Sequence, residues 1–216
     1  MYVALDVETK NLGSDILGGN EQLLSVQIAD GTNQKLFWAD SKDPQWNLES
    51  AKREITSLLS QGVTFAGYNI DFDVTMMKQF LGVEIPKSQT LDLCHTSEIE
   101  EFHKITTDWS LERACEKYYV NANHKRRMKE KAEQYKRRED IQEKAKAEAE
   151  KILRVKPTWT PNYAYDRALN KIAGGYAIYD AYLEFVQSGG QKNTLFYEYA
   201  IGDVISEYQL LKALGY

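Results

Sequence analysis

The chain has 216 residues, of which 43% are hydrophobic and 27% are charged, and its formal net charge is −5. This length suits one domain with an elaboration, and the composition is that of a globular protein, which excludes the disordered and fibrous classes. The N-terminus lacks a basic segment followed by an apolar one, and no apolar run approaches the roughly 18–20 residues of a membrane span. Two isolated cysteines cannot build a disulfide framework. We therefore expect a cytoplasmic protein that does not contact a membrane.

The first half of the chain predicts strands and then alternating helices and strands. A three-stranded antiparallel start is expected from Met1–Val7, Leu23–Ala29 and Lys35–Ala39, because the Asp30-Gly31 turn separates the last two. Apolar residues at helical spacing predict a helix at Leu48–Ser60. The next expected elements are a strand at Val63–Gly67, a helix at Asp71–Leu81, an edge strand at Thr90–Leu93 and a helix that begins after Ser110 as its N-cap. This order predicts a mixed α/β domain with one central sheet.

A change in composition sets residues 124–154 apart. They carry 12 Lys+Arg and 7 Asp+Glu, a net +5, so the rest of the chain carries −10. The absence of Gly and Pro predicts either one long helix of about 45 Å or a helical hairpin. Its apolar positions are few, so we expect the segment to be mostly solvated. Pro157 and Pro161 follow it, and two more helices are expected, at Tyr163–Gln187 and Thr194–Leu214.

Acidic residues at the ends of predicted elements are the candidates for chemistry. Cleavage of a phosphodiester at neutral pH needs an activated water and a sink for charge on the leaving oxygen, and divalent ions held by carboxylates supply both. Asp6 and Glu8 follow the apolar part of the first predicted strand. Residues i and i+2 of a strand share a face, so both carboxylates can reach one site. A D-x-E triplet also arises by chance in an acidic chain.

A second motif lies where a predicted strand ends at Gly67 and a helix follows. The segment GYNIDFD places Asp73 in the first turn of that helix. Asp71 and Asp73 could instead only complement the helix dipole, and Asn69 could be only an N-cap.

A third motif, YAIGD, belongs to the last predicted helix. Tyr199 and Asp203 stand four residues apart and so share one helical face. The small residues Ala200 and Gly202 between them permit a close approach of substrate or of another helix. The alternative interpretation is a partly buried tyrosine beside a surface aspartate.

Together the three motifs resemble those of the DnaQ-like (DEDD) 3′→5′ exonuclease superfamily. LDVETKNL is similar to its first motif, D-x-E-T, GYNIDFD to its second, N-x-x-F/Y-D, and YAIGD to its third, Y-x-x-x-D. The second match selects Asp73 over Asp71. The resemblance covers about residues 1–119 and 163–216, and it implies a ribonuclease-H-like fold with a central mixed β-sheet flanked by helices. The chain is then a single domain, 1–216, with a long, charged, basic helical insertion at about 120–160.

The third motif also indicates the subgroup. The alternative subgroup has a histidine five residues before the last aspartate, and this chain has Glu198 there. The chain therefore resembles the tyrosine (DEDDy) subgroup and is most similar to the proofreading exonuclease domains of family A DNA polymerases.

The resemblance also implies roles for individual residues. Two divalent metal ions, Mg²⁺ or Mn²⁺, would be held by the carboxylates of Asp6, Glu8, Asp73 and Asp203. Tyr199 would hydrogen-bond the attacking water, since its ordinary pKa near 10 makes it a poor base. The residues expected to bind substrate are Thr9, Leu12 and Asn69.

Three functions are compatible with these motifs. The favoured one is hydrolysis of DNA from the 3′ end, releasing 5′-mononucleotides, by a stand-alone proofreading, repair or replication nuclease. Its partners would be single-stranded DNA or a frayed 3′ end and a DNA polymerase or another replication protein. An RNase D-like exoribonuclease would use the same ligands on RNA. A subunit that binds nucleic acid or a polymerase through its helical arm would not need four convergent carboxylates.

The remaining polar residues give no separate signal. His95, His103 and His124 show no ligand spacing, so we expect surface or internally satisfied side chains. The basic helical segment is either a solvated face or a surface for nucleic-acid backbone or a protein partner.

Overall fold

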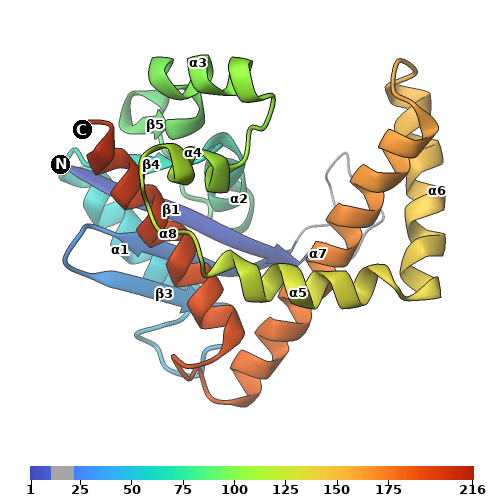
Figure 1. Cartoon of the computed structure of the whole chain (residues 1–216). Coiled ribbons are helices and arrows are strands. Elements are labelled where there is room, and N and C mark those ends of the chain that lie inside the picture. Colours follow the sequence, from blue (N-terminus) through green and yellow to red (C-terminus); the bar gives the residue numbers. More distant parts are fainter. Residues whose placement is uncertain (11–21) are drawn as a thin grey trace. The chain divides into compact units, whose positions relative to one another are not determined.

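A computed structural model of the chain describes residues 1–10 and 22–216 (Figure 1). The chain divides into two compact units. The first comprises Met1–Glu8, Leu23–His124 and Tyr197–Tyr216, and the second comprises Thr9–Gln22 and Lys125–Phe196. The substrate-contact residue expected at position 12 lies outside the described residues. None of the helices in the described ranges combines the length and the apolar character that crossing a membrane requires.

The first unit contains a five-stranded mixed sheet in the order β3-β2-β1-β4-β5. Its strands are β1 (Tyr2–Lys10), β2 (Gln22–Ala29), β3 (Gln34–Trp38), β4 (Thr64–Gly67) and β5 (Thr90–Asp92). β2 and β3 pair antiparallel, whereas β4 pairs parallel with both β1 and β5. All five predicted strands and the mixed α/β class are confirmed.

Alternation along β1 assigns its side chains to two cores. Val3, Leu5 and Val7 enter a large apolar cluster with Ala51 and Ile55 of α1 (Leu48–Ser60). Ala4, on the opposite face, packs with Ala29 of β2 and Val204 of α8 (Leu195–Ala213). Since the period of a strand is two, Asp6 and Glu8 lie on the same face as Ala4. The acidic pair therefore lies on the side of the sheet that α8 covers.

The other helices of the first unit are short. α2 (Asp71–Met76) continues into a π-helical turn, η1 (Met77–Leu81), that ends at Gly82 with φ 65°. Two 3₁₀ turns, η2 (Lys87–Gln89) and η3 (Leu93–His95), flank β5. α4 (Leu111–Lys117) begins after Ser110, whose hydroxyl accepts the N–H of Arg113 as predicted. The sequence did not predict α3 (Ser97–Thr106), because only Ile99 and His103 of it are buried.

The second unit is built on three helices, α5 (Lys125–Lys136), α6 (Glu139–Val155) and α7 (Pro161–Gln187). Of the two alternatives for residues 124–154, one long helix is wrong: the segment forms two helices, which separate at Arg138, where the backbone is extended. Most residues of α6 are exposed, as expected for a mostly solvated segment, but one face of the helix is buried. Its stripe Ile141, Ala145, Ala149 and Ile152 is buried against Ala164, Ala168, Ile172 and Ala173 of α7. A sparse stripe suffices because alanines on the facing helix permit close packing.

Glycine at the end of β4 is required by a close approach of two strands. A Cβ on Gly67 would lie 2.8 Å from the carbonyl oxygen of Leu5 and 3.3 Å from Ile70. We expect Gly67→Ala to lower the free energy of unfolding by about 1–3 kcal/mol, as overpacking does, in urea denaturation followed by circular dichroism. Gly174→Ala in α7 is the control, since its Cβ meets nothing within 4 Å and helix propensity favours alanine by about 0.5–1 kcal/mol. A Gly67→Ala protein as stable as wild type would contradict this packing.

Candidate metal centre

Three acidic side chains from distant parts of the sequence converge in the first unit. Asp6 and Glu8 come from β1 and Asp203 from α8, and each offers a carboxylate oxygen within 4.8 Å of the others. Glu8 and Asp203 are 7% and 5% exposed. Three of the four predicted ligands therefore lie together.

The carboxylate of Asp6 is at the centre of this electrostatic arrangement. Asp6 is half-buried, and its Oδ2 is buried without a hydrogen-bond partner among the described residues. Burial, followed by the charges of Glu207 and Glu8, raises the pKa of Asp6 well above its usual value. Repulsion between these carboxylates is relieved when one of them binds a proton or when a cation binds between them. Carboxylate oxygens are the ligands that hard divalent ions prefer. The residues present thus fit a divalent metal ion.

Asp73, the fourth predicted ligand, lies near Asp6 but is not one of the three residues whose carboxylate oxygens converge. Its Oδ1 accepts the N–H of Val7 in β1 at 3.0 Å, and burial raises its pKa to about 8. Its charge also contributes to the raised pKa of Asp6. Asp71, by contrast, is exposed and pairs with Lys87 at 2.7 Å. The first turn of α2 therefore directs one aspartate toward the acidic group and the other to the surface.

Tyr199 is placed one helical turn before Asp203 on α8. Burial, then the charges of Asp203, Glu8 and Asp6, and hydrogen bonding with Asp203 raise the pKa of its hydroxyl well above 10. The hydroxyl therefore stays protonated at neutral pH and can only donate or accept hydrogen bonds. It cannot serve as a general base.

The residues expected to contact substrate are placed less centrally. Asn69 is exposed in the turn between β4 and α2 and has a left-handed backbone with φ 67°. Its N–H donates to Oδ1 of Asp92 at 2.9 Å, which holds this conformation. Thr9 is half-buried near the end of β1.

Glu207 is an acidic residue that the sequence reasoning missed. It is 3% exposed, and its Oε1 accepts the N–H of Tyr68 at 2.9 Å. Among neighbouring charges it is the largest contributor to the raised pKa of Asp6. The available signal was its spacing, because Glu207 follows Asp203 by one helical turn and so lies on the same face of α8.

His124 is the second missed residue. Its Nε2 lies 3.0 Å from Oδ1 of Asp203, and its side chain is only 13% exposed. Its ring packs on Gly202, where a Cβ would lie 2.6 Å from Cδ2 of the imidazole. The ring centroid of Tyr199 is 6.4 Å away. His124 thus orients the carboxylate of Asp203. This contact could not be predicted from local residue spacing in the sequence.

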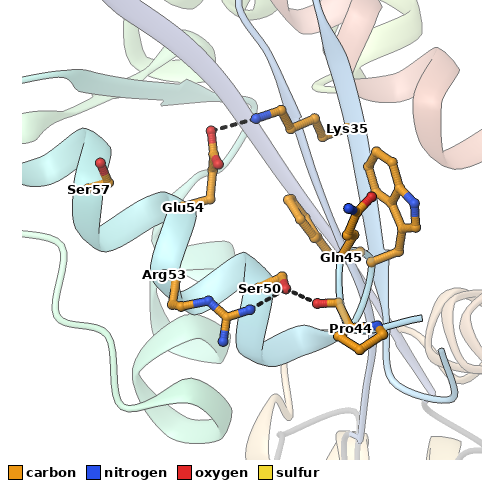
Figure 2. Close-up of a pocket in the computed structure, with 9 residues that line it drawn as sticks. Lys35, Pro44, Gln45, Ser50, Arg53, Glu54 and Ser57 are labelled. Atoms are coloured by element: carbon orange, nitrogen blue, oxygen red, sulfur yellow. Dashed lines mark hydrogen bonds and ion pairs between the residues drawn. The ribbon is translucent and has the colours of Figure 1, made fainter. Parts of the chain in front are cut away.

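A hollow of about 500 Å³ lies elsewhere in the first unit, between β3 and α1 (Figure 2). Its charged groups have partners within the hollow: Lys35 pairs with Glu54 at 2.7 Å, and Arg53 donates to the hydroxyl of Ser50 at 2.7 Å. It contains none of the predicted site residues. The acidic group, and not this hollow, is therefore the candidate functional site.

Comparison with protein-family models finds no match, and no curated protein matches the sequence significantly.

The raised pKa of Asp73 has a consequence for stability without metal. Its carboxyl binds a proton more tightly in the folded state (about 8) than in the unfolded state (about 3.9). Its contribution to stability is therefore fully present below about pH 4 and is lost as the pH rises toward about 8. In EDTA we expect Asp73→Asn to flatten the fall of the melting temperature over this range.

Asp30→Asn is the control for this experiment. Although partial burial opposes it, hydrogen bonds from the N–H groups of Asn33 and Thr32 lower the pKa of Asp30 to about 2. The contribution of Asp30 to stability is constant above about pH 4. Asp30→Asn should therefore shift the melting temperature by the same amount at every pH in this range and leave its slope against pH unchanged. Equal slopes for wild type and Asp73→Asn would contradict the assignment.

The contact of His124 with Asp203 predicts an effect on metal affinity. Outer-sphere partners of metal ligands contribute roughly 10–100-fold, so we expect His124→Ala and Gly202→Ala to weaken Mn²⁺ binding by about 10-fold or more. Isothermal titration calorimetry measures this directly. His95→Ala is the control, because His95 is 59% exposed and pairs with Glu100. Wild-type affinity in both His124→Ala and Gly202→Ala would show that His124 does not orient Asp203.

Proposed function

We propose that this protein is a divalent-metal-dependent 3′→5′ exonuclease that hydrolyses DNA from the 3′ end and releases 5′-mononucleotides. The observation that carries the proposal is the convergence of Asp6, Glu8 and Asp203 around a buried oxygen of Asp6 that has no hydrogen-bond partner among the described residues. Motifs from the two ends of the chain, each weak alone, meet at one place. This convergence of buried carboxylates does not stabilise the fold, because buried like charges oppose folding.

Each residue of the site has a role in this chemistry. Asp6, Glu8 and Asp203 would hold the metal ions, with Asp73 at their side. When bound, two Mg²⁺ or Mn²⁺ ions supply an activated water and neutralise charge on the leaving oxygen. Tyr199, kept protonated by its surroundings, donates a hydrogen bond that orients the attacking water. His124 keeps the carboxylate of Asp203 in place.

The arrangement of the sheet is compatible with the ribonuclease-H-like fold that we propose for the first unit. An antiparallel β2–β3 pair lies on one side of β1, and the parallel strands β4 and β5 lie on the other. The acidic pair is carried by the central strand of the five, and α8 supplies the third carboxylate. Proposed partners are single-stranded DNA or a frayed 3′ end, with a polymerase or another replication protein.

The test uses 5′-labelled single-stranded DNA and RNA of one sequence with Mg²⁺, Mn²⁺ or EDTA. We expect a ladder that shortens from the 3′ end of DNA and disappears in EDTA. Asp203→Asn should lower the rate by more than the roughly 10–100-fold that loss of an outer-sphere group costs. Asp71→Asn, a change of the same kind at an exposed ion-paired position, should leave the rate unchanged.

Three outcomes would overturn parts of this proposal. Faster shortening of RNA would replace DNA by RNA as the substrate. Shortening that persists in EDTA would exclude metal-dependent catalysis. No shortening of either strand would exclude exonuclease activity and favour a subunit that only binds.

A further inference from the structure

The turn between α6 and α7 in the second unit concentrates positive charge. Residues Lys151–Lys171 include five basic residues and one acidic residue, a net +4 in a chain whose total charge is −5. The helices α6 and α7 pack on each other as a helical hairpin, and this turn joins them (Figure 1).

Several basic residues of the second unit are neutralised by neighbouring acids. Lys131 pairs with Asp180 and Glu184 at 2.7 and 2.9 Å, and Arg138 pairs with Asp140 at 2.9 Å. Arg154, Lys156 and Arg167, however, form no ion pair within residues 1–10 and 22–216. All three are exposed. Their charge is therefore available to an anionic partner.

Aromatic side chains lie beside these cations. Trp159 and Tyr163 contact edge to face with ring centroids 4.7 Å apart, and Nζ of Lys156 lies 4.6 Å from the centroid of Trp159. Tyr163 is 49% exposed. Arg167 follows Tyr163 by one helical turn, on the same face of α7. An exposed ring flanked by unpaired cations matches a nucleobase next to its phosphates, because the bases stack and the cations neutralise.

We propose that this hairpin end, defined by Arg154, Lys156, Trp159, Tyr163 and Arg167, binds single-stranded nucleic acid. Bases stack on the exposed face of Tyr163, while Arg154, Lys156 and Arg167 contact the phosphates. An acidic protein surface would use the cations but would leave the exposed ring without a matching group. The inference extends the proposed function, since the strand bound here is of the class hydrolysed by the nuclease, but binding itself needs no metal ion.

The test measures the affinity for a fluorescent 20-residue oligothymidylate by anisotropy in EDTA, where no cleavage occurs. Loss of one stacked base costs about 1–3 kcal/mol, so Tyr163→Ala should raise Kd about 5- to 150-fold, whereas Tyr163→Phe should keep wild-type affinity. Lys156→Glu should weaken binding and make its dependence on salt shallower. Lys146→Glu is the matched control, an equal charge change at an exposed residue of α6 without an ion pair in the described ranges.

Each outcome decides between specific alternatives. Equal affinities of Lys156→Glu and Lys146→Glu, or an unchanged Kd for Tyr163→Ala, would overturn the hairpin-end site even if the protein cuts DNA. Loss of binding on substitution of the hairpin end, in a protein that cuts neither strand, would support this site and reject the nuclease. Circular dichroism of each variant confirms that α6 and α7 remain folded.

Discussion

The packing of α8 on the small residues of the central sheet is the constraint on which the candidate site depends. Ala4 of β1 and Ala29 of β2 leave room for Val204, and this contact fixes the neighbouring Asp203 beside the face that carries Asp6 and Glu8. A larger side chain at Ala4 would hold the helix away from the strand. The apolar contact thus supplies the free energy that holds mutually repelling carboxylates together.

That repulsion is balanced by specific hydrogen bonds around the site. The N–H of Val7 donates to Asp73, the N–H of Tyr68 donates to Glu207, and His124 holds Asp203. These partners belong to different elements, so the carboxylates are fixed relative to one another before any ligand arrives. A site prepared in this way loses little conformational entropy on binding a cation, at the expense of stability without one.

Local patterns in the sequence predicted what depends on periodicity and missed what depends on tertiary packing. Alternation in β1 predicted the shared face of Asp6 and Glu8, and helical spacing placed Tyr199 and Asp203 together. His124 lies 79 residues before Asp203, so no spacing rule connects them. The position of the break between α5 and α6 was not predicted, because no Gly or Pro marks Arg138, where the backbone is extended.

The most direct test of metal binding by Asp6, Glu8 and Asp203 is anomalous diffraction from crystals of the protein grown with Mn²⁺. We expect an anomalous peak coordinated by carboxylate oxygens of Asp6, Glu8 and Asp203, and the loss of this peak in Asp6→Asn. Crystals saturated with Mn²⁺ that show no peak at these three residues would contradict a metal centre, because the buried carboxylates would then have converged for a reason other than metal binding.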